Sequence, residues 1–124
     1  MIVNIPCDVE RERKKKYPVV IFFHGLGDHP WNMALYGTNR RLLSNKYKFI
    51  VAFGWGTNCD SISDHRCGFN IKNPQKDFEY LENMVEFLLQ NNYTDKQKFY
   101  FVGFSNGDIF SSLVAQKYGI NCLS

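Results

Sequence analysis

Three short runs of apolar residues, rich in β-branched and aromatic side chains, most constrain the fold of this chain. They occupy residues 19–23, 49–53 and 99–102. Because none of them alternates polar and apolar residues, each run predicts a strand that is buried on both faces of a sheet. Amphipathic stretches separate the runs, which is the pattern of an α/β domain with a mainly parallel sheet and flanking helices. Residues 3–6 predict the remnant of a further strand.

Apolar residues at helical spacing predict helices between and after these strands. Asn73-Pro74 is interpreted as an N-cap followed by a proline at the first helical position. The apolar face of the helix that follows comprises Phe78, Leu81, Met84, Val85, Leu88 and Leu89. A last helix is predicted to lay Ile109, Phe110, Leu113, Val114 and Tyr118 on the sheet. After a loop that begins at Pro30, another helix is expected from about Thr38. Residues 54–73 show neither the helical nor the strand periodicity of apolar residues. They therefore predict a long loop, and long loops in compact domains are often functional.

Length and charge exclude several classes of protein. With 124 residues, 44% hydrophobic composition and a net charge of +3, the sequence predicts one soluble globular domain. The charge is too small to indicate a nucleic-acid partner, and no apolar run approaches the ~20 residues that span a membrane. The first residues lack the pattern of a signal peptide, so localisation stays open. We expect no nucleic acid and no membrane among its partners.

The sequence Gly103-Phe104-Ser105-Asn106-Gly107 is a G-x-S-x-G motif between a predicted buried strand and a predicted helix. This context is the one that a nucleophile elbow requires. Glycines at 103 and 107 would remove collisions between the tight turn and the adjacent strand and helix. The turn would expose the hydroxyl of Ser105 and direct the N–H of Asn106 at the same space. The alternative is an ordinary glycine-rich turn of a nucleotide-binding unit, but neither phosphate-binding glycine pattern occurs in the sequence.

A second glycine-rich loop, His24-Gly25-Leu26-Gly27, follows the first buried strand. In enzymes with a nucleophile elbow, a backbone N–H from such a loop joins the N–H after the nucleophile in an oxyanion hole. Leu26 is the expected donor, with Gly27 as the second choice. For His24 we favour a structural role, in which the imidazole holds the loop by hydrogen bonds, over a catalytic one.

These motifs, in this order, resemble the polyhydroxybutyrate depolymerase and feruloyl esterase branch of the α/β-hydrolase family. The positions that carry the resemblance are 17–25, Trp55, Cys67-Gly68, Asp77, Asp95 and Ser105-Asn106-Gly107. Lys76 and Asp108 depart from the family pattern, which has an aspartate and a small residue there. The resemblance covers most of the chain.

The resemblance implies a serine esterase that works through an acyl-serine, with Ser105 as nucleophile. It also implies an order of Ser, acid and then His along the chain. Only 19 residues follow Ser105, and all three histidines (24, 29 and 65) precede it. We therefore expect residues 1–124 to be a single incomplete domain, a partial α/β-hydrolase that ends just after the elbow helix. The acid and base would belong to a missing C-terminal half, and His65 is the one histidine that could substitute. The alternative is a non-catalytic remnant or binding module that retains the hydrolase core.

The family also suggests the substrate, which would be an ester of a plant-wall phenolic or of a polyhydroxyalkanoate, with Trp55 in its binding site. Neither a cofactor nor a metal is expected, because the spacing of the four cysteines does not fit a zinc site. Cys59 and Cys67 are close enough in sequence to close a small loop, and from the residues alone free thiols and a disulfide both remain open. Members of the family are often secreted and have bridged loops of this kind, so the resemblance implies that the two cysteines pair in an exported protein.

Overall fold

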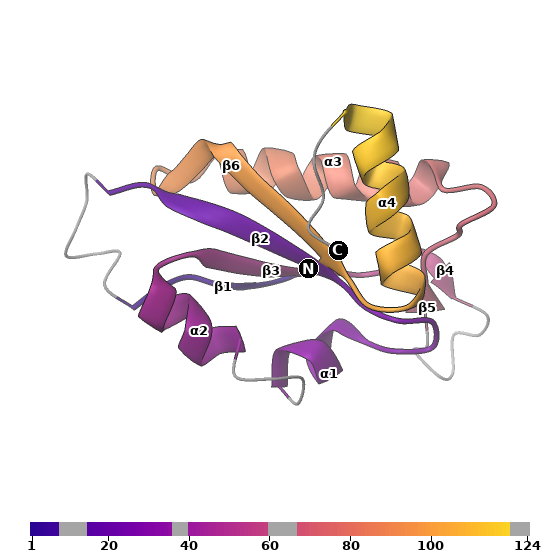
Figure 1. Cartoon of the computed structure of the whole chain (residues 1–124), viewed down its shortest axis with the longest axis horizontal. Helices are drawn as coiled ribbons and strands as arrows, with labels where there is room; N and C mark the ends of the chain where they lie inside the picture. The colour runs from indigo at the N-terminus through magenta and orange to yellow at the C-terminus, as the bar shows by residue number, and fades with distance from the viewer. Residues whose placement is uncertain (8–14, 36–39, 60–66, 120–124) are drawn as a thin grey trace.

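The computed structural model describes residues 1–7, 15–35, 40–59 and 67–119, which form an α/β fold with a four-stranded, mostly parallel sheet (Figure 1). The predicted runs became β2 (Tyr17–Phe23), β3 (Ile50–Gly54) and β6 (Thr94–Gly103). The order across the sheet is β1-β3-β2-β6, and β1 (Ile2–Asn4) pairs with β3 in the antiparallel direction. The predicted fold class, a mainly parallel sheet with flanking helices, is confirmed at this level.

The register of the parallel strands brings three chain segments to one edge of the sheet. Phe23, at the end of β2, lies opposite Gly54 of β3 on one side and Gly103 of β6 on the other. The residues that follow these positions therefore leave the sheet side by side. In this way, the loop after β2, the loop after β3 and the G-x-S-x-G turn after β6 meet at the carboxyl edge, although they are far apart in the sequence (Figure 1).

Helices cover both faces of the sheet (Figure 1). Helices α3 (Gln75–Leu89) and α4 (Asn106–Tyr118) contact β6, and α4 also contacts β2. On the opposite face, α1 (Pro30–Leu35) and α2 (Arg40–Tyr47) contact β3. Within the described ranges, every helix is too short or too polar to span a lipid bilayer.

A cluster of aromatic rings joins the sheet to α4 and to the loop after β3. The ring of Phe23 makes edge-to-face contacts with both Phe69 and Phe110, at centroid distances of 5.2 and 4.9 Å. Phe69 stacks in turn on Phe110 at 4.6 Å. All three side chains are buried. The loop residue Phe69 is therefore part of the main core, and it anchors its loop to the sheet.

Two of the helix predictions are wrong in detail. Asn73 is not the N-cap of α3, because the capping position is Pro74 and no side chain caps the helix there. The N–H of Asn73 is instead bonded to the side chain of Asn70, within the preceding turn. In α4, Ile109 is 51% exposed, whereas Phe110 is fully buried. Consecutive helical residues point about 100° apart, so a helix that directs Phe110 at the sheet turns Ile109 towards solvent. Tyr118 is also exposed.

Two segments predicted to be loops contain regular structure. The loop expected from Pro30 contains helix α1. Asp28 supports the start of this helix, because its side chain accepts hydrogen bonds from the N–H of His29 and from the side chain of Asn32. The loop expected at 54–73 holds β4 (Asn58–Cys59) and β5 (Cys67–Gly68), which pair antiparallel. The helix expected from about Thr38 begins at Arg40, and Thr38 itself lies outside the described residues.

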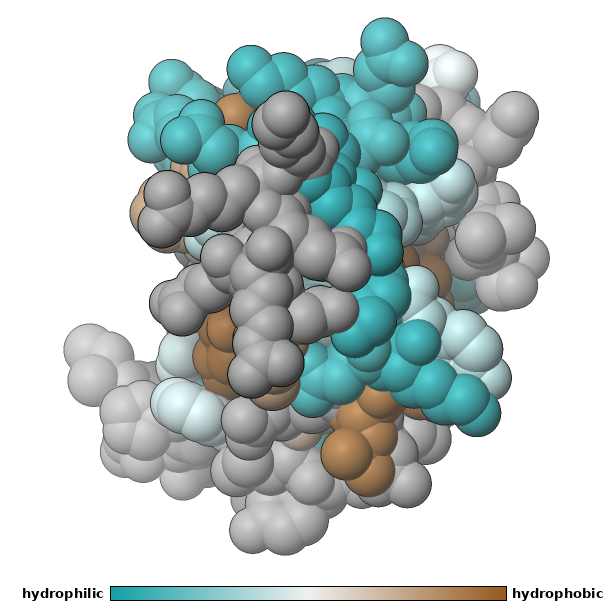
Figure 2. Space-filling model, turned by 90° about the vertical axis from the view of Figure 1, so that its left-hand side faces the viewer, coloured by the Kyte–Doolittle hydropathy of each residue, from teal (hydrophilic) through white to brown (hydrophobic). Residues whose placement is uncertain are grey.

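The opposite end of the molecule, where the parallel strands begin, has a different surface. Figure 2 views this end, and its described residues are mainly hydrophilic, with small separate hydrophobic areas. The exposed apolar residues next to the G-x-S-x-G turn, namely Leu26, Phe104 and Ile109, belong to the carboxyl edge of the sheet. At the carboxyl edge these three apolar side chains are therefore exposed beside the turn.

Candidate active site at the carboxyl edge of the sheet

Ser105 occupies a strained backbone conformation between β6 and α4. Its φ and ψ angles are 55° and −117°. Among the described residues other than glycine, only Ser105 and Lys48 have a positive φ. A non-glycine residue in such a region costs of order 1–3 kcal/mol and persists only where the surroundings enforce it. The side chain of Ser105 is exposed. The fold therefore holds an accessible hydroxyl on a sharp strand-to-helix turn.

The glycines of the motif are required by the closeness of the backbone around the turn. A Cβ atom built on Gly103 would lie 2.1 Å from the carbonyl oxygen of Gly107. A Cβ atom on Gly107 would lie 2.3 Å from the carbonyl oxygen of Phe23. Neither backbone oxygen can move aside without displacing β2 or α4. The collisions predicted from the sequence therefore exist in the structure, and they involve the backbone of α4 at Gly103 and of β2 at Gly107.

The loop after β2 runs alongside the serine. A Cβ atom built on Gly25 would lie 3.6 Å from the Cβ of Ser105. The N–H of Gly27 is occupied, because it donates to the carbonyl oxygen of Cys67 at 3.1 Å. Within the described residues, no hydrogen bond uses the backbone N–H of Leu26 or of Asn106. Of the two donors considered for this loop, Leu26 therefore keeps an N–H that a ligand could use, and Gly27 does not.

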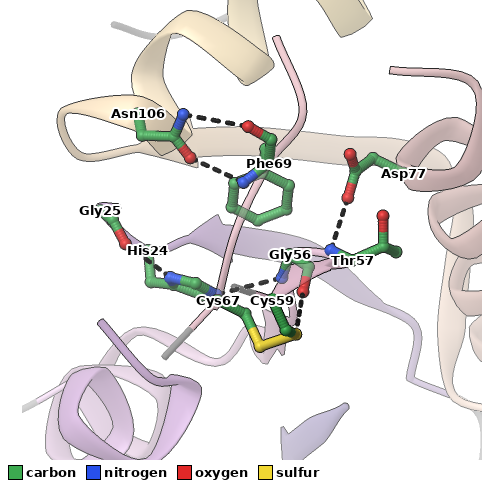
Figure 3. The surroundings of a disulfide bond; sticks show 9 residues. All are labelled: His24, Gly25, Gly56, Thr57, Cys59, Cys67, Phe69, Asp77 and Asn106. Carbon is green, nitrogen blue, oxygen red and sulfur yellow. Dashed lines mark hydrogen bonds between the residues drawn. A yellow bond between two sulfur atoms is a disulfide. The ribbon is translucent and has the colours of Figure 1, made fainter. Parts of the chain in front are cut away.

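His24 is fully buried, and both of its ring nitrogens are hydrogen-bonded to the backbone (Figure 3). Nδ1 lies 2.8 Å from the carbonyl oxygen of Gly25, and Nε2 accepts the N–H of Gly56 at 3.1 Å. This pairing requires the neutral tautomer with the proton on Nδ1. Burial lowers the pKa of His24, which also favours the neutral ring. The imidazole therefore ties the loop after β2 to the loop after β3, and it has no free nitrogen to accept a proton from Ser105.

The other two histidines differ in what the structure says of them. His29 is half-buried, its Nδ1 accepts the N–H of Trp31 at 3.1 Å, and its ring lies 4.4 Å from that of Trp55. Trp55 follows β3, so it lies at the same edge of the sheet as the serine, although its side chain is half-buried against His29. His65 lies outside the described residues.

Asp77 and Asn106 hold the loop after β3 in place by bonds to its backbone (Figure 3). The buried carboxylate of Asp77 accepts the N–H of Thr57 and the N–H of Asn70, each at 2.8 Å. The side chain of Asn106 accepts the N–H of Phe69 at 2.7 Å and donates to its carbonyl oxygen at 3.1 Å. Sequence reasoning noted both residues but missed these roles, because nothing local predicts that Asn106 bonds a residue 37 positions away or Asp77 one 20 positions away. The resemblance at Asp77 was the one available signal.

A disulfide closes the hairpin formed by β4 and β5 (Figure 3). Cys59 and Cys67 are joined with an S–S distance of 2.01 Å and a Cα–Cα distance of 4.2 Å. Close backbone packing accompanies it, because a Cβ atom built on Gly56 would lie 2.2 Å from the carbonyl oxygen of Gly68. Of the cysteines in the described ranges, Cys7 is a free thiol and is exposed. The loop is therefore restrained by a covalent bond as well as by polar ones.

The remaining charged residues singled out from the sequence lie in different places. Asp108, in the first turn of α4, is half-buried, and its N–H donates to the carbonyl oxygen of Ser105. Asp95 lies near the start of β6, at the opposite end of that strand from Ser105, and its carboxylate is 3.5 Å from Lys98. Lys76 is exposed on α3. Within the described part of the chain, no group of three or more His, Cys, Asp or Glu residues could hold a metal ion.

Comparison with known proteins relates the chain to one hydrolase. No protein-family model matches the sequence. The chain is 32% identical over 118 residues to an uncharacterized hydrolase of Acanthamoeba polyphaga mimivirus, and the match covers 77% of this chain. It covers 38% of the viral protein, so the chain spans well under half the length of that relative. This chain is thus a distant homologue of a viral protein that is described as a hydrolase and is itself uncharacterized.

Proposed function

We propose that this chain carries the nucleophile and the oxyanion hole of a serine esterase of the feruloyl esterase or polyhydroxybutyrate depolymerase type. The observation that carries the proposal is the exposed Ser105, held at a positive φ on a strand-to-helix turn between two obligatory glycines. An ordinary glycine-rich turn has no reason to impose strain on a serine. The resemblance of the sequence to α/β-hydrolases and the homology to a hydrolase agree with this interpretation.

In this reaction the Oγ of Ser105 attacks the carbonyl carbon of a carboxylic ester, and its proton passes to a general base. The carbonyl oxygen becomes an oxyanion, which accepts hydrogen bonds from the N–H groups of Leu26 and Asn106. Collapse of this intermediate releases the alcohol, which takes up the proton, and leaves an acyl-serine. Water then hydrolyses the acyl-serine by the same steps and restores the hydroxyl. No cofactor takes part in this scheme.

The base and its acidic partner belong, in this proposal, to residues that the structure does not describe. Both nitrogens of His24 are bonded to the backbone, and Asp95 lies at the far end of β6. The sources proposed here are His65 and a further segment of polypeptide, such as a C-terminal half of the domain. Without a base, the 124-residue chain is expected to leave only a residual activity from its oxyanion donors.

The substrate proposed is an ester with an apolar or aromatic acyl group, as in a plant-wall phenolic or a polyhydroxyalkanoate. Leu26 and Phe104, which flank the turn, are 67% and 66% exposed, and Ile109 is exposed one turn along α4. Trp55 lies at the same edge of the sheet. These side chains would border the acyl group of an ester at Ser105, and they favour apolar over charged substrates.

The test is covalent labelling of the protein, expressed from its whole gene, with a fluorophosphonate probe. We expect labelling of the unsubstituted protein, none of Ser105→Ala, and full labelling of Ser112→Ala. Ser112 is an exposed serine of α4, the helix that follows Ser105, so it controls for the loss of a nearby hydroxyl. Equal labelling of the Ser105→Ala variant and the unsubstituted protein would exclude Ser105 as the nucleophile.

A non-catalytic binding module that retains the hydrolase core is the second candidate. Asp108 favours it, because a carboxylate in the turn after the nucleophile opposes a developing oxyanion. If the module is the true function, the protein from the whole gene will neither react with the probe nor hydrolyse methyl ferulate. Ser105-dependent turnover of p-nitrophenyl acetate or methyl ferulate would exclude it.

A further inference from the structure

Three consecutive residues, Cys67, Gly68 and Phe69, lie between the two loops that offer the oxyanion donors. On one side, the carbonyl oxygen of Cys67 accepts the N–H of Gly27, which follows Leu26. On the other side, the backbone of Phe69 forms two hydrogen bonds with the side chain of Asn106. The segment 67–69 therefore contacts both loops directly, at positions two residues apart.

Gly68 shows how closely the three segments approach one another. A Cβ atom built on this residue would lie 2.5 Å from the Cδ1 of Leu26 and 3.1 Å from the Oδ1 of Asn106. Leu26 and Asn106 are the two proposed donors, so both of them meet at a residue that has no side chain. A Cβ at 68 would make the exposed side chain of Leu26 turn aside and would press on the Oδ1 of Asn106, while the Cα of Leu26, at 3.6 Å, would be in ordinary contact.

The segment 67–69 is itself held firmly. Phe69 is 3% exposed, and its ring contacts Phe23, His24 and Phe110. Cys67 is fixed by the disulfide to Cys59 and by a β-bridge to Asp28. The segment therefore joins the two loops as one unit, so a change in its bonds to one loop is expected to reach the other.

We propose that residues 67–69 are a spacer that sets the separation of the Leu26 and Asn106 N–H groups, and that the side chain of Asn106 is the positioning residue that fixes the elbow to this spacer. The inference rests on the proposed function, since it concerns the oxyanion hole of that same site. Asn106 thus serves the reaction twice. Its backbone N–H binds the oxyanion, and its side chain holds that N–H at the correct distance from the other donor.

The alternative is that Asn106 only stabilises the turn around itself, so the experiment measures a property of the opposite loop. Amide hydrogen exchange is recorded for Phe69 and for Gly27 in the unsubstituted protein and in Asn106→Ala. We expect exchange at both amides to rise about tenfold, because the loss of one hydrogen bond corresponds to about that factor. Asn83→Ala, which removes an exposed asparagine of α3, should change neither amide.

Asn106→Asp keeps the size of the side chain and provides the test if the alanine variant does not fold. Its carboxylate can accept the N–H of Phe69 but cannot donate to the carbonyl oxygen, so exchange at Gly27 should rise by less than in Asn106→Ala. If the amide of Phe69 exchanges faster in either variant while exchange at the amide of Gly27 is unchanged, the proposal that residues 67–69 act as a spacer is wrong. This readout does not involve catalysis, so it is independent of whether Ser105 is the nucleophile.

Kinetics of the protein from the whole gene supply the second readout. Misplacement of an oxyanion donor by about 1 Å costs up to about 10²-fold in rate. We therefore expect Asn106→Ala to lower kcat for methyl ferulate by up to that factor while KM stays unchanged, because the donor acts on the transition state. A raised KM with unchanged kcat would overturn the positioning role. Loss of turnover in Ser105→Ala tests the proposed function separately.

Discussion

Different forces hold the sheet core and the described parts of the loop after β3, residues 54–59 and 67–73. In the core, buried apolar side chains of β2, β3, α3 and α4 pack against one another. In the loop, the backbone is held by side chains from distant elements: His24 binds Gly56, Asp77 binds Thr57 and Asn70, and Asn106 binds Phe69. Phe69 anchors the described part of the loop in the core, and polar side chains and a disulfide add restraints on the loop backbone.

The comparison shows how a site can be rigid where the fold offers little burial. Hydrogen bonds to a buried carboxylate contribute about 1.5–3 kcal/mol each, which is comparable with burying an apolar side chain. Unlike apolar packing, hydrogen bonds depend on the direction from donor to acceptor, so they fix the positions of particular backbone N–H and C=O groups. Packing of the core therefore provides most of the stability of the fold, and the polar bonds fix the positions of the loops beside Ser105.

The largest effect is expected in the core. Phe110→Ala should lower the free energy of unfolding by about 3–5 kcal/mol, because the residue is fully buried among other aromatic rings. The measurement is urea unfolding followed by fluorescence. Phe87→Ala is the matched control, since Phe87 is 53% exposed on α3 and should cost about 1 kcal/mol or less. Equal losses for the two variants would show that α4 does not pack as described.

A smaller effect is expected from the disulfide. Replacing Cys59 and Cys67 together by serine should lower the free energy of unfolding by about 2–3 kcal/mol, which is the entropy that a short closed loop removes from the unfolded chain. Urea unfolding of protein made in an oxidising compartment measures the loss, and Cys7→Ser, which removes the exposed free thiol, is the control. Free thiols at both positions in non-reducing peptide mapping would contradict the pairing.

The smallest effect is expected from the protonation of His24. Burial lowers its pKa in the folded protein below the value of about 6.5 that it has when unfolded. The unfolded chain therefore binds the proton more readily. The stability that neutral His24 contributes is complete above about pH 6.5 and is lost as the pH falls from there towards the folded-state pKa.

Unfolding free energies measured from pH 8 to pH 5 test this effect. In His24→Asn the decline with falling pH should be smaller than in the unsubstituted protein. If the two curves run parallel, His24 does not link the loops in its neutral form.

Much of the fold could be predicted because apolar runs and helical periodicity are local signals. The three parallel strands, the helix that carries Phe78 and Leu81, and the helix after Ser105 follow from them. The run at 99–102 is not buried on both faces as expected, because Tyr100 of β6 is 37% exposed. Errors arose where a local rule competed with tertiary packing. Asn73 has the chemistry of an N-cap, yet its N–H is bonded to the turn before α3. Ile109 fits an apolar face, yet the direction of Phe110 turns it outwards.

The candidate site divides in the same way between sequence and structure. The sequence by itself determined the tight turn at Ser105, because Gly103, Ser105 and Gly107 are close together and their spacing has a steric meaning. It also named the loop at 24–27. Only the tertiary structure decided that the N–H of Gly27 is bonded to the carbonyl oxygen of Cys67 and that both ring nitrogens of His24 are bonded. It also decided that the side chains of Asp77 and Asn106 hold the loop after β3. Those contacts depend on which strand ends meet, and strand pairing joins residues too far apart for any local pattern to record.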